Sequence, residues 1–246
     1  MSNKYKLVFS IRFLGYFLFF VGCFGVVFIL GPLLQVEFGY KLDRAMGVKR
    51  VVAETPAIVP TPEPISSPAP GVQPSVQPTP QPTPSQPGFE SVSSSEQVIQ
   101  PVSTQYGIVI EKINANAKII PNVNPAKESE YAAALKDGVA EALGSTPPGQ
   151  PGNLYLFSHS TDAPWNIIRF NAIFFLLREL ETGDRVIIFH DNKRYDYIVF
   201  DKIIARANDV SYLTNRYEIP VLTLQTCDPP GTLLNRLIIR AKLVSS

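Results

Sequence analysis

A proline-rich stretch divides this chain and limits which parts of it can fold. Twelve of the 23 prolines fall between residues 53 and 100, with Ser, Gln, Thr and Val filling the gaps. Proline fixes φ and has no N–H to donate, so neither a helix nor a central strand can persist there. We therefore predict a disordered linker over residues 53–104. In extended form, at about 3.1 Å per residue, it could also act as a stalk on the order of 100 Å long.

An uncharged apolar run precedes the linker. Residues 13–36 read FLGYFLFFVGCFGVVFILGPLLQV, and a membrane-spanning helix needs about 20 apolar residues. No small-residue cleavage site follows, so we predict a transmembrane signal-anchor and not a cleaved signal peptide. Basic residues before the run favour a cytoplasmic N-terminus, residues 1–12. Residues 37–52 are then a juxtamembrane segment, and the chain crosses the cell membrane once with its C-terminal part outside the cell.

The remaining residues, 105–246, can build a core, and their number is typical of one domain. Short apolar, β-branched runs separated by turn residues predict strands. These strands are expected over residues 106–113, 117–120, 153–158, 185–190, 194–204, 221–226 and 236–243. Apolar residues at helical spacing predict a helix over 167–180, and a short helical turn fits 130–135. The pattern indicates a mainly β domain, folded as a closed antiparallel barrel with one or two short helices.

Charge and cysteine content argue against two classes of protein. Lys and Arg number 22 against 21 for Asp and Glu, a formal charge of +1, so no nucleic-acid partner is expected. Two cysteines cannot make a disulfide framework, and they lack the spacing of a zinc site, so no metal is expected. Cys23 lies in the apolar run and is interpreted as a small membrane-helix residue. Cys227 is the thiol that needs an explanation.

Two candidate reactive residues each stand at the end of a predicted strand. Cys227 follows the run 221–226, and His159 follows the run 153–158. Strand ends are positions where a rigid scaffold presents reactive groups. The alternatives are a buried free cysteine acting as a small hydrophobe and a surface histidine in a loop. The second histidine, His190, enters a hairpin turn and is interpreted as solvated.

Two arginines mark the last predicted strand. Arg236 and Arg240 are an even number of residues apart, so both point to the same face of the strand. Arg236 is nearer the turn that returns the chain to Cys227. An arginine beside a thiol can stabilise an oxyanion, although a solvated cation at a strand edge is the alternative. We expect Arg236, and not Arg240, to lie next to the thiol.

Four segments in this order resemble the sortase family. Residues 222–227, LTLQTC, resemble its TLxTC signature, and residues 152–159 resemble the strand that leads to its catalytic histidine. Residues 180–186, LETGDRV, are similar to the L-x-x-GD-x-V stretch of that fold, and residues 236–239 to the start of its last strand. Ser158 stands where the family usually has glycine, so the subclass stays open between class A-like and class D/E-like members.

The resemblance implies an eight-stranded β-barrel and a membrane-anchored cysteine transpeptidase without a cofactor. Cys227 would attack an LPxTG-like sorting signal of a secreted protein and form a thioacyl intermediate. Arg236 would stabilise the oxyanion, and His159 would transfer protons. Beside this triad, Thr226 and Trp165 are candidate substrate contacts, with a core aromatic as the alternative for Trp165. The acceptor would be an amine such as a cell-wall precursor or a pilin lysine.

Two other functions remain open from the sequence. A thiol peptidase that only hydrolyses its substrate would carry the same residues. A catalytically silent anchored barrel, used for assembly or adhesion, would carry an unreactive Cys227.

Overall fold

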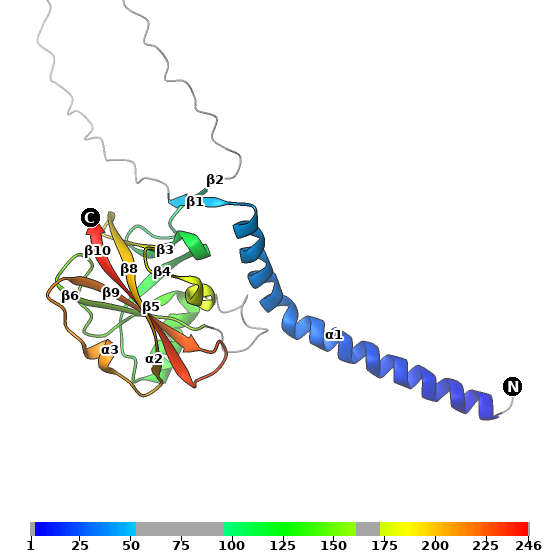
Figure 1. The fold of residues 1–246 in the computed structure, drawn as a ribbon. Helices are drawn as coiled ribbons and strands as arrows, with labels where there is room; N and C mark the ends of the chain where they lie inside the picture. Colours follow the sequence, from blue (N-terminus) through cyan, green and yellow to red (C-terminus); the bar gives the residue numbers. More distant parts are fainter. Residues whose placement is uncertain (1–2, 53–95, 161–172, 246) are drawn as a thin grey trace, which may run out of the picture.

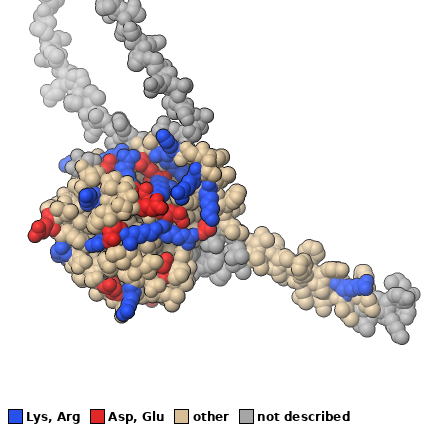
Figure 2. Space-filling model, in the orientation of Figure 1, with Lys and Arg blue, Asp and Glu red and all other residues tan. Residues whose placement is uncertain are grey.

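A long N-terminal helix leads into a β-barrel in the computed structural model, which describes residues 3–52, 96–160 and 173–245 (Figure 1). The helix, α1, spans Asn3–Ala45. Its segment Val8–Phe28 is long and apolar enough to cross a membrane, and none of it is buried within the protein. Figure 2 shows that the part of α1 beyond the barrel is uncharged except near its N-terminal end.

Within the described residues, eight strands close into a barrel in the order β10-β8-β7-β3-β4-β5-β6-β9, which confirms the predicted eight-stranded fold. The strands are β3 (Tyr106–Ile110), β4 (Ala115–Val123), β5 (Val139–Ala142), β6 (Gly152–Phe157), β7 (Arg185–His190), β8 (Lys193–Arg206), β9 (Pro220–Asp228) and β10 (Asn235–Ser245). Among the described residues, four short helices connect them: η1 (Glu111–Ile113), α2 (Glu128–Asp137), η3 (Phe175–Glu179) and α3 (Ser211–Thr214).

The expectation of an antiparallel barrel is wrong for two of the strand pairs. β4 pairs with β5, and β6 with β9, in parallel. Parallel neighbours need a crossover connection, and α2 supplies one between β4 and β5. β5 itself was not predicted, because it has four residues and follows α2 without a turn signal beyond Gly138. The barrel is therefore mixed.

The prediction of a helix over 167–180 is also wrong for the part of this range that the structure describes. Residues 167–172 lie outside the described part, and the remainder forms only a short 3₁₀ helix, η3 (Phe175–Glu179). The N–H of Leu177 donates to the carbonyl of Phe174, and that of Leu180 to Leu177. These three apolar residues are spaced by three, which matches the three residues per turn of a 3₁₀ helix. All three are fully buried. In contrast, α2 extends the predicted turn 130–135 in both directions.

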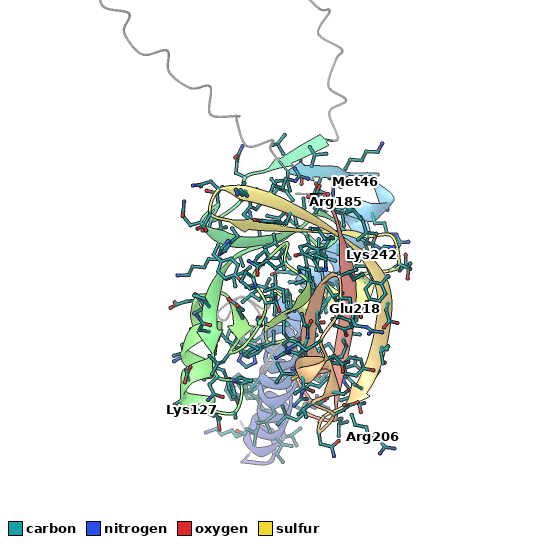
Figure 3. The ribbon with its side chains drawn as sticks, turned by 90° about the vertical axis from the view of Figure 1, so that its left-hand side faces the viewer. Met46, Lys127, Arg185, Arg206, Glu218 and Lys242 are labelled. Carbon is teal, nitrogen blue, oxygen red and sulfur yellow. The ribbon has the colours of Figure 1, made fainter. Side chains whose placement is uncertain are left out.

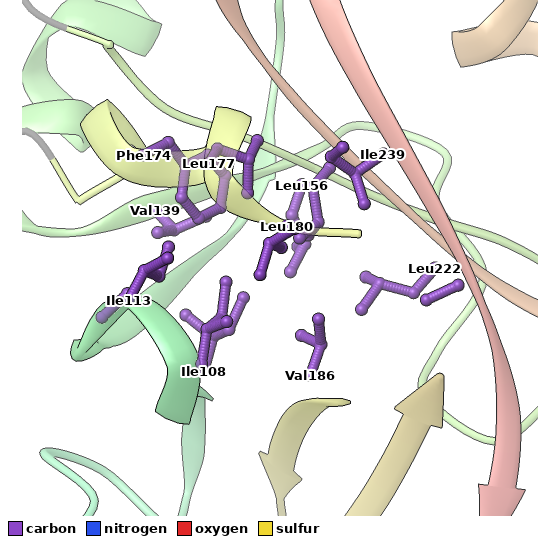
Figure 4. Close-up of a cluster of buried hydrophobic side chains, with 14 of the residues drawn as sticks. Ile108, Ile113, Val139, Leu156, Phe174, Leu177, Leu180, Val186, Leu222 and Ile239 are labelled. Atoms are coloured by element: carbon purple, nitrogen blue, oxygen red, sulfur yellow. The ribbon is translucent and has the colours of Figure 1, made fainter. Parts of the chain in front are cut away.

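The barrel interior is one apolar core. Figure 4 shows side chains from η3 and from several strands meeting there, including Ile108, Leu156, Leu222 and Ile239. All four side chains are fully buried. Burying a side chain of this size stabilises the fold by about 1.5–3 kcal/mol. The strands that carry the candidate site, β6, β9 and β10, all contribute to this core, so their ends are held rigidly.

A small parallel sheet lies beside the barrel, within the ranges predicted as juxtamembrane segment and linker. Its strands are β1 (Lys49–Val52) and β2 (Glu96–Ile99). Figure 3 shows Met46, between α1 and β1, at one end of the barrel with Arg185, whereas Lys127 and Arg206 lie at the other end.

Candidate active site

The parallel pairing of β6 and β9 places two candidate residues at one end of the barrel. Phe157 pairs with Gln225, and the Ser158 N–H donates to the Gln225 carbonyl at 3.2 Å. Parallel strands run in the same direction, so the residues that end them come together. His159 follows the end of β6, and Cys227 lies near the end of β9. The two predicted reactive residues are thus brought to one place.

A buried hydrogen bond connects the two residues that precede them. The Thr226 hydroxyl donates to the Ser158 carbonyl at 3.0 Å, and Thr226 is only 4% exposed. Thr226 lines the groove beside Cys227, where we predicted a substrate contact. Its hydroxyl, however, bonds to the backbone before His159. This contact fixes the strand that carries the thiol against the segment that carries the histidine.

Arg236 lies directly across from the thiol. It pairs with Cys227 in the antiparallel register of β9 and β10, and side chains opposite each other in such a pair lie on the same face about 4.5–5.5 Å apart at Cβ. The guanidinium Nη1 donates to the carbonyl of Asn235 at 3.0 Å and of Leu233 at 3.4 Å. The turn between the strands therefore orients this cation.

Arg240 is engaged elsewhere. Its guanidinium donates to Asp201 Oδ2 at 2.8 and 2.5 Å and to the Tyr217 hydroxyl at 3.2 Å. In the strand register it faces Thr223, four residues before Cys227. Of these two arginines, Arg236 is the one beside the thiol, as expected.

These residues open onto one groove of about 190 Å³. The groove is lined by Pro125, Tyr131, Leu135, Phe157, Ser158, His159, Gln225, Thr226, Cys227, Leu233 and Arg236. Much of its wall is apolar and comes from α2 and from the β9–β10 turn. We did not predict these wall residues. Tyr131 and Leu135 stand four apart on α2, which places them on one helix face, but nothing in the sequence indicates what that face covers.

The chain was compared with known proteins. A family model described as a sortase domain matches residues 108–244. This chain belongs to the sortase family. Sortases are cysteine transpeptidases, so the chain is an enzyme of that class. No curated protein matches it.

Solved structures of other sortases are similar to this one. Sortase C-1 from Actinomyces oris is 22% identical, with 59% of this chain and 76% of that chain covered and a TM-score of 0.49. A sortase D5 transpeptidase from Clostridium perfringens is 21% identical, with 57% and 79% covered and a TM-score of 0.47. Sortase A from Corynebacterium diphtheriae is 23% identical, with 58% and 61% covered and a TM-score of 0.48.

The thiol of this sortase experiences two opposing effects. Burial raises the pKa of Cys227 above its ordinary value, and the positive charge of Arg236 partly offsets that rise. Burial also raises the pKa of Tyr155, again against the charge of Arg236. The Tyr155 hydroxyl donates to Gln225 Oε1 at 2.5 Å. The positive charge of Arg236 therefore opposes the rise in pKa of both Cys227 on β9 and Tyr155 on β6.

Trp165, a predicted substrate contact, lies outside the described residues. His190, which we expected to be solvated, is half-buried, and its ring lies 4.9 Å from that of Tyr106, edge to face. It was misjudged because the pairing of β3 with β7, which places Tyr106 beside it, is not visible in the local sequence. Across the described ranges, no three His, Cys, Asp or Glu side chains are grouped for a metal ion.

Proposed function

We propose that this sortase cleaves an LPxTG-like sorting signal through a thioacyl-enzyme intermediate and transfers the released protein to an amine. The observation that carries the proposal is that Cys227, His159 and Arg236 line one groove, with Arg236 opposite the thiol in the strand register. A nucleophile, a proton donor and a fixed cation are the groups that acyl transfer requires.

In the first half-reaction, the Cys227 thiolate attacks the threonine carbonyl of the signal. The oxygen gains negative charge, and the Arg236 guanidinium donates to it. His159, in its protonated form, gives a proton to the leaving amine as the carbon–nitrogen bond breaks. The product is a thioester between the threonine carbonyl and Cys227, together with the free C-terminal part of the signal.

In the second half-reaction, an amine attacks the thioester. His159 accepts the proton from the attacking amine, and Cys227 leaves as a thiolate, so the enzyme returns to its starting state. The acceptor is proposed to be a cell-wall precursor or a pilin lysine. Water in place of the amine would give hydrolysis, the alternative function considered from the sequence.

The proposed location follows from α1. We place its apolar segment in the cell membrane, with the N-terminus in the cytoplasm and the barrel outside. Basic residues before the segment support this orientation. A barrel on the outer side would meet secreted proteins after they have crossed the same membrane.

The test uses the full-length chain in detergent with a sorting-signal peptide and an amine acceptor, followed by mass spectrometry. We expect a peptide–amine product, and no cleavage by Cys227→Ala. Cys23→Ala is the matched control, because Cys23 lies exposed on α1, and it should retain activity. Free acid as the sole product at high amine concentration would contradict transfer, and cleavage by Cys227→Ala would contradict the assigned nucleophile.

A further inference from the structure

The anchor helix continues beyond its apolar segment and packs against the barrel. Val36 and Tyr40 of α1 contact the main barrel core. They lie across from Ile173 and Phe175, around a cavity of about 370 Å³. We call residues 35–43 of α1 the docked segment. Val36 and Tyr40 are four residues apart, so they lie on one face of the helix, and this face packs on the barrel.

Two ion pairs fix the docked segment at its sides. Glu37 pairs with Arg178 of η3, and each side chain is about one-third exposed, 32% and 33%. Asp43 pairs with Arg50 of β1, whose side chain is only 9% exposed. Partly buried pairs are screened less by salt than exposed ones. The contacts therefore define both the rotation of α1 and its position along the barrel.

The strands on either side of the proline-rich stretch are held together. β1 and β2 pair in parallel from Lys49 opposite Glu96 to Val52 opposite Ile99, and paired strands lie about 4.8 Å apart. The Val52 N–H donates to Glu111 Oε1 of η1 at 2.9 Å. The side chains of Val52 and Ile99 are buried against three barrel residues, Val109, Ile187 and Phe189. Val52 and Glu96, the described residues that flank the proline-rich stretch, thus both belong to one small sheet packed on the barrel.

We propose that the docked segment is a rigid strut that holds the active site at a fixed position near the membrane, and that the proline-rich stretch is a side loop outside the tether. From Phe28 to Val36 the helix rises about 12 Å at 1.5 Å per residue. The connection between bilayer and barrel is therefore short and helical. A stalk on the order of 100 Å, as the proline content suggested, is not in the path.

The direction of the strut places the groove on the membrane side. Met46 lies at the end of the barrel opposite Arg206, and α1 extends from there to the level of Arg206 (Figure 3). Only the C-terminal part of α1 lies beside the barrel, and the rest runs away from it (Figure 1). Arg206 pairs with Asn235, the neighbour of Arg236 in β10. The groove thus opens at the end toward which the membrane helix runs. Resting on the proposed function, this inference makes the substrate a signal presented close to the bilayer surface.

The test reconstitutes the full-length chain in vesicles of phosphatidylethanolamine and phosphatidylglycerol. The substrate is a sorting-signal peptide attached to lipid through spacers of graded length. We expect cleavage to peak at one short spacer length. Replacement of residues 54–94 by a short Gly/Ser loop should leave that peak unchanged. If the proline-rich stretch were the tether, the replacement would bring the barrel closer to the bilayer and shift the preferred spacer to shorter lengths, and the proposal would be wrong.

Charge reversal separates the strut from the barrel. Glu37→Arg and Arg178→Glu should each reduce cleavage at the preferred spacer by about tenfold, because effective concentration falls steeply when a tether no longer matches the span. The double variant should restore it. Lys41→Glu, an exposed reversal on the same helix, is the matched control and should have no effect. Turnover of the untethered peptide should stay unchanged in every variant. Loss of the spacer preference in the control, or its retention in both single variants, would overturn the strut.

A second measurement does not depend on turnover. Glu37→Cys with Arg178→Cys, in a chain also carrying Cys23→Ser and Cys227→Ala, should be joined by a short bis-maleimide within one molecule. Lys6→Cys with Arg178→Cys should not be joined. Equal yields for the two pairs would contradict docking whatever the activity. If the native chain cleaved no peptide while this variant was cross-linked, the proposed function alone would be contradicted.

Discussion

The burial of Cys227 and the charge of Arg236 act in opposite directions on one thiol. A raised pKa keeps most of the thiol protonated at neutral pH, and the thiolate is the nucleophile. Arg236 would therefore have two roles in the reaction. It favours the thiolate before attack, and it would stabilise the oxyanion after attack.

This balance predicts a pH profile for Cys227. In a Cys23→Ser chain, the rate of alkylation by iodoacetamide should still be rising above pH 9.0, the ordinary thiol pKa. The sign follows from the raised pKa, because the thiolate appears only as pH passes through it. Arg236→Ala should move the midpoint up further, by up to about one unit, since it removes the opposing cation.

The control for that prediction is Arg240→Ala, because this arginine is on the same strand but bound to Asp201. Arg240→Ala should leave the pH midpoint of Cys227 alkylation unchanged. A larger shift with Arg240→Ala than with Arg236→Ala would show that the wrong arginine has been assigned to the thiol.

At the scale of elements, the site depends on the parallel contact between β6 and β9. β6 and β9 are about 70 residues apart in sequence, and they are joined by the Thr226 hydroxyl as well as by their backbone hydrogen bonds. Thr223 adds a second buried contact of the same kind, with its hydroxyl donating to Asn153 Oδ1 at 2.7 Å. The position of His159 relative to Cys227 is therefore set by strand pairing.

Thr226→Val should separate the contribution of the hydroxyl from that of the backbone pairing, because valine keeps the shape of threonine and removes the hydroxyl. The buried Ser158 carbonyl would lose a donor, at a cost of about 1–3 kcal/mol in the free energy of unfolding. Turnover of the signal peptide should fall as well, while Thr226→Ser should restore both. Urea denaturation and peptide cleavage are the measurements. A valine variant as stable and as active as the native chain would exclude this positioning role.

Local patterns were sufficient for the strands that carry the site, but not for their partners. The runs 153–158 and 221–226 correspond to β6 and β9, because alternation and turn residues are local signals. The parallel pairing, the half-buried position of His190 and the apolar wall from Tyr131 were not predictable from short windows. Each depends on which distant segment packs alongside. The identities of Cys227, His159 and Arg236 came from their placement at strand ends and from the family motifs.

At the scale of the whole molecule, the barrel also buries a carboxyl group that does not line the groove. Glu141 of β5 is 8% exposed and accepts a hydrogen bond from the Tyr106 hydroxyl at 3.0 Å. Burial raises the pKa of Glu141, while the bond from Tyr106 and the charge of His190 oppose the rise. Ionisation of this carboxyl therefore works against the fold.

The raised pKa gives stability a definite pH dependence. The contribution of Glu141 is fully present below the pKa it has in the unfolded chain, and it is lost as pH rises through the folded pKa. Glu141→Gln cannot ionise, so its stability relative to the native chain should improve between about pH 4 and 7. Glu181→Gln should show the reverse trend, because Lys112 lowers the pKa of Glu181. Urea denaturation at several pH values measures both trends. A constant difference for Glu141→Gln would contradict the prediction.

The pairing of β1 with β2 also bears on how the enzyme, in its proposed orientation outside the cell, could be released from the membrane. A protein on a simple stalk is shed when a protease cuts the stalk once. Here a single cut between residues 53 and 95 would break the chain but leave β1 paired with β2 and the anchor helix packed on the barrel. Release would also require those contacts to separate. The part of the chain richest in proline is therefore a place where a nick need not detach the enzyme.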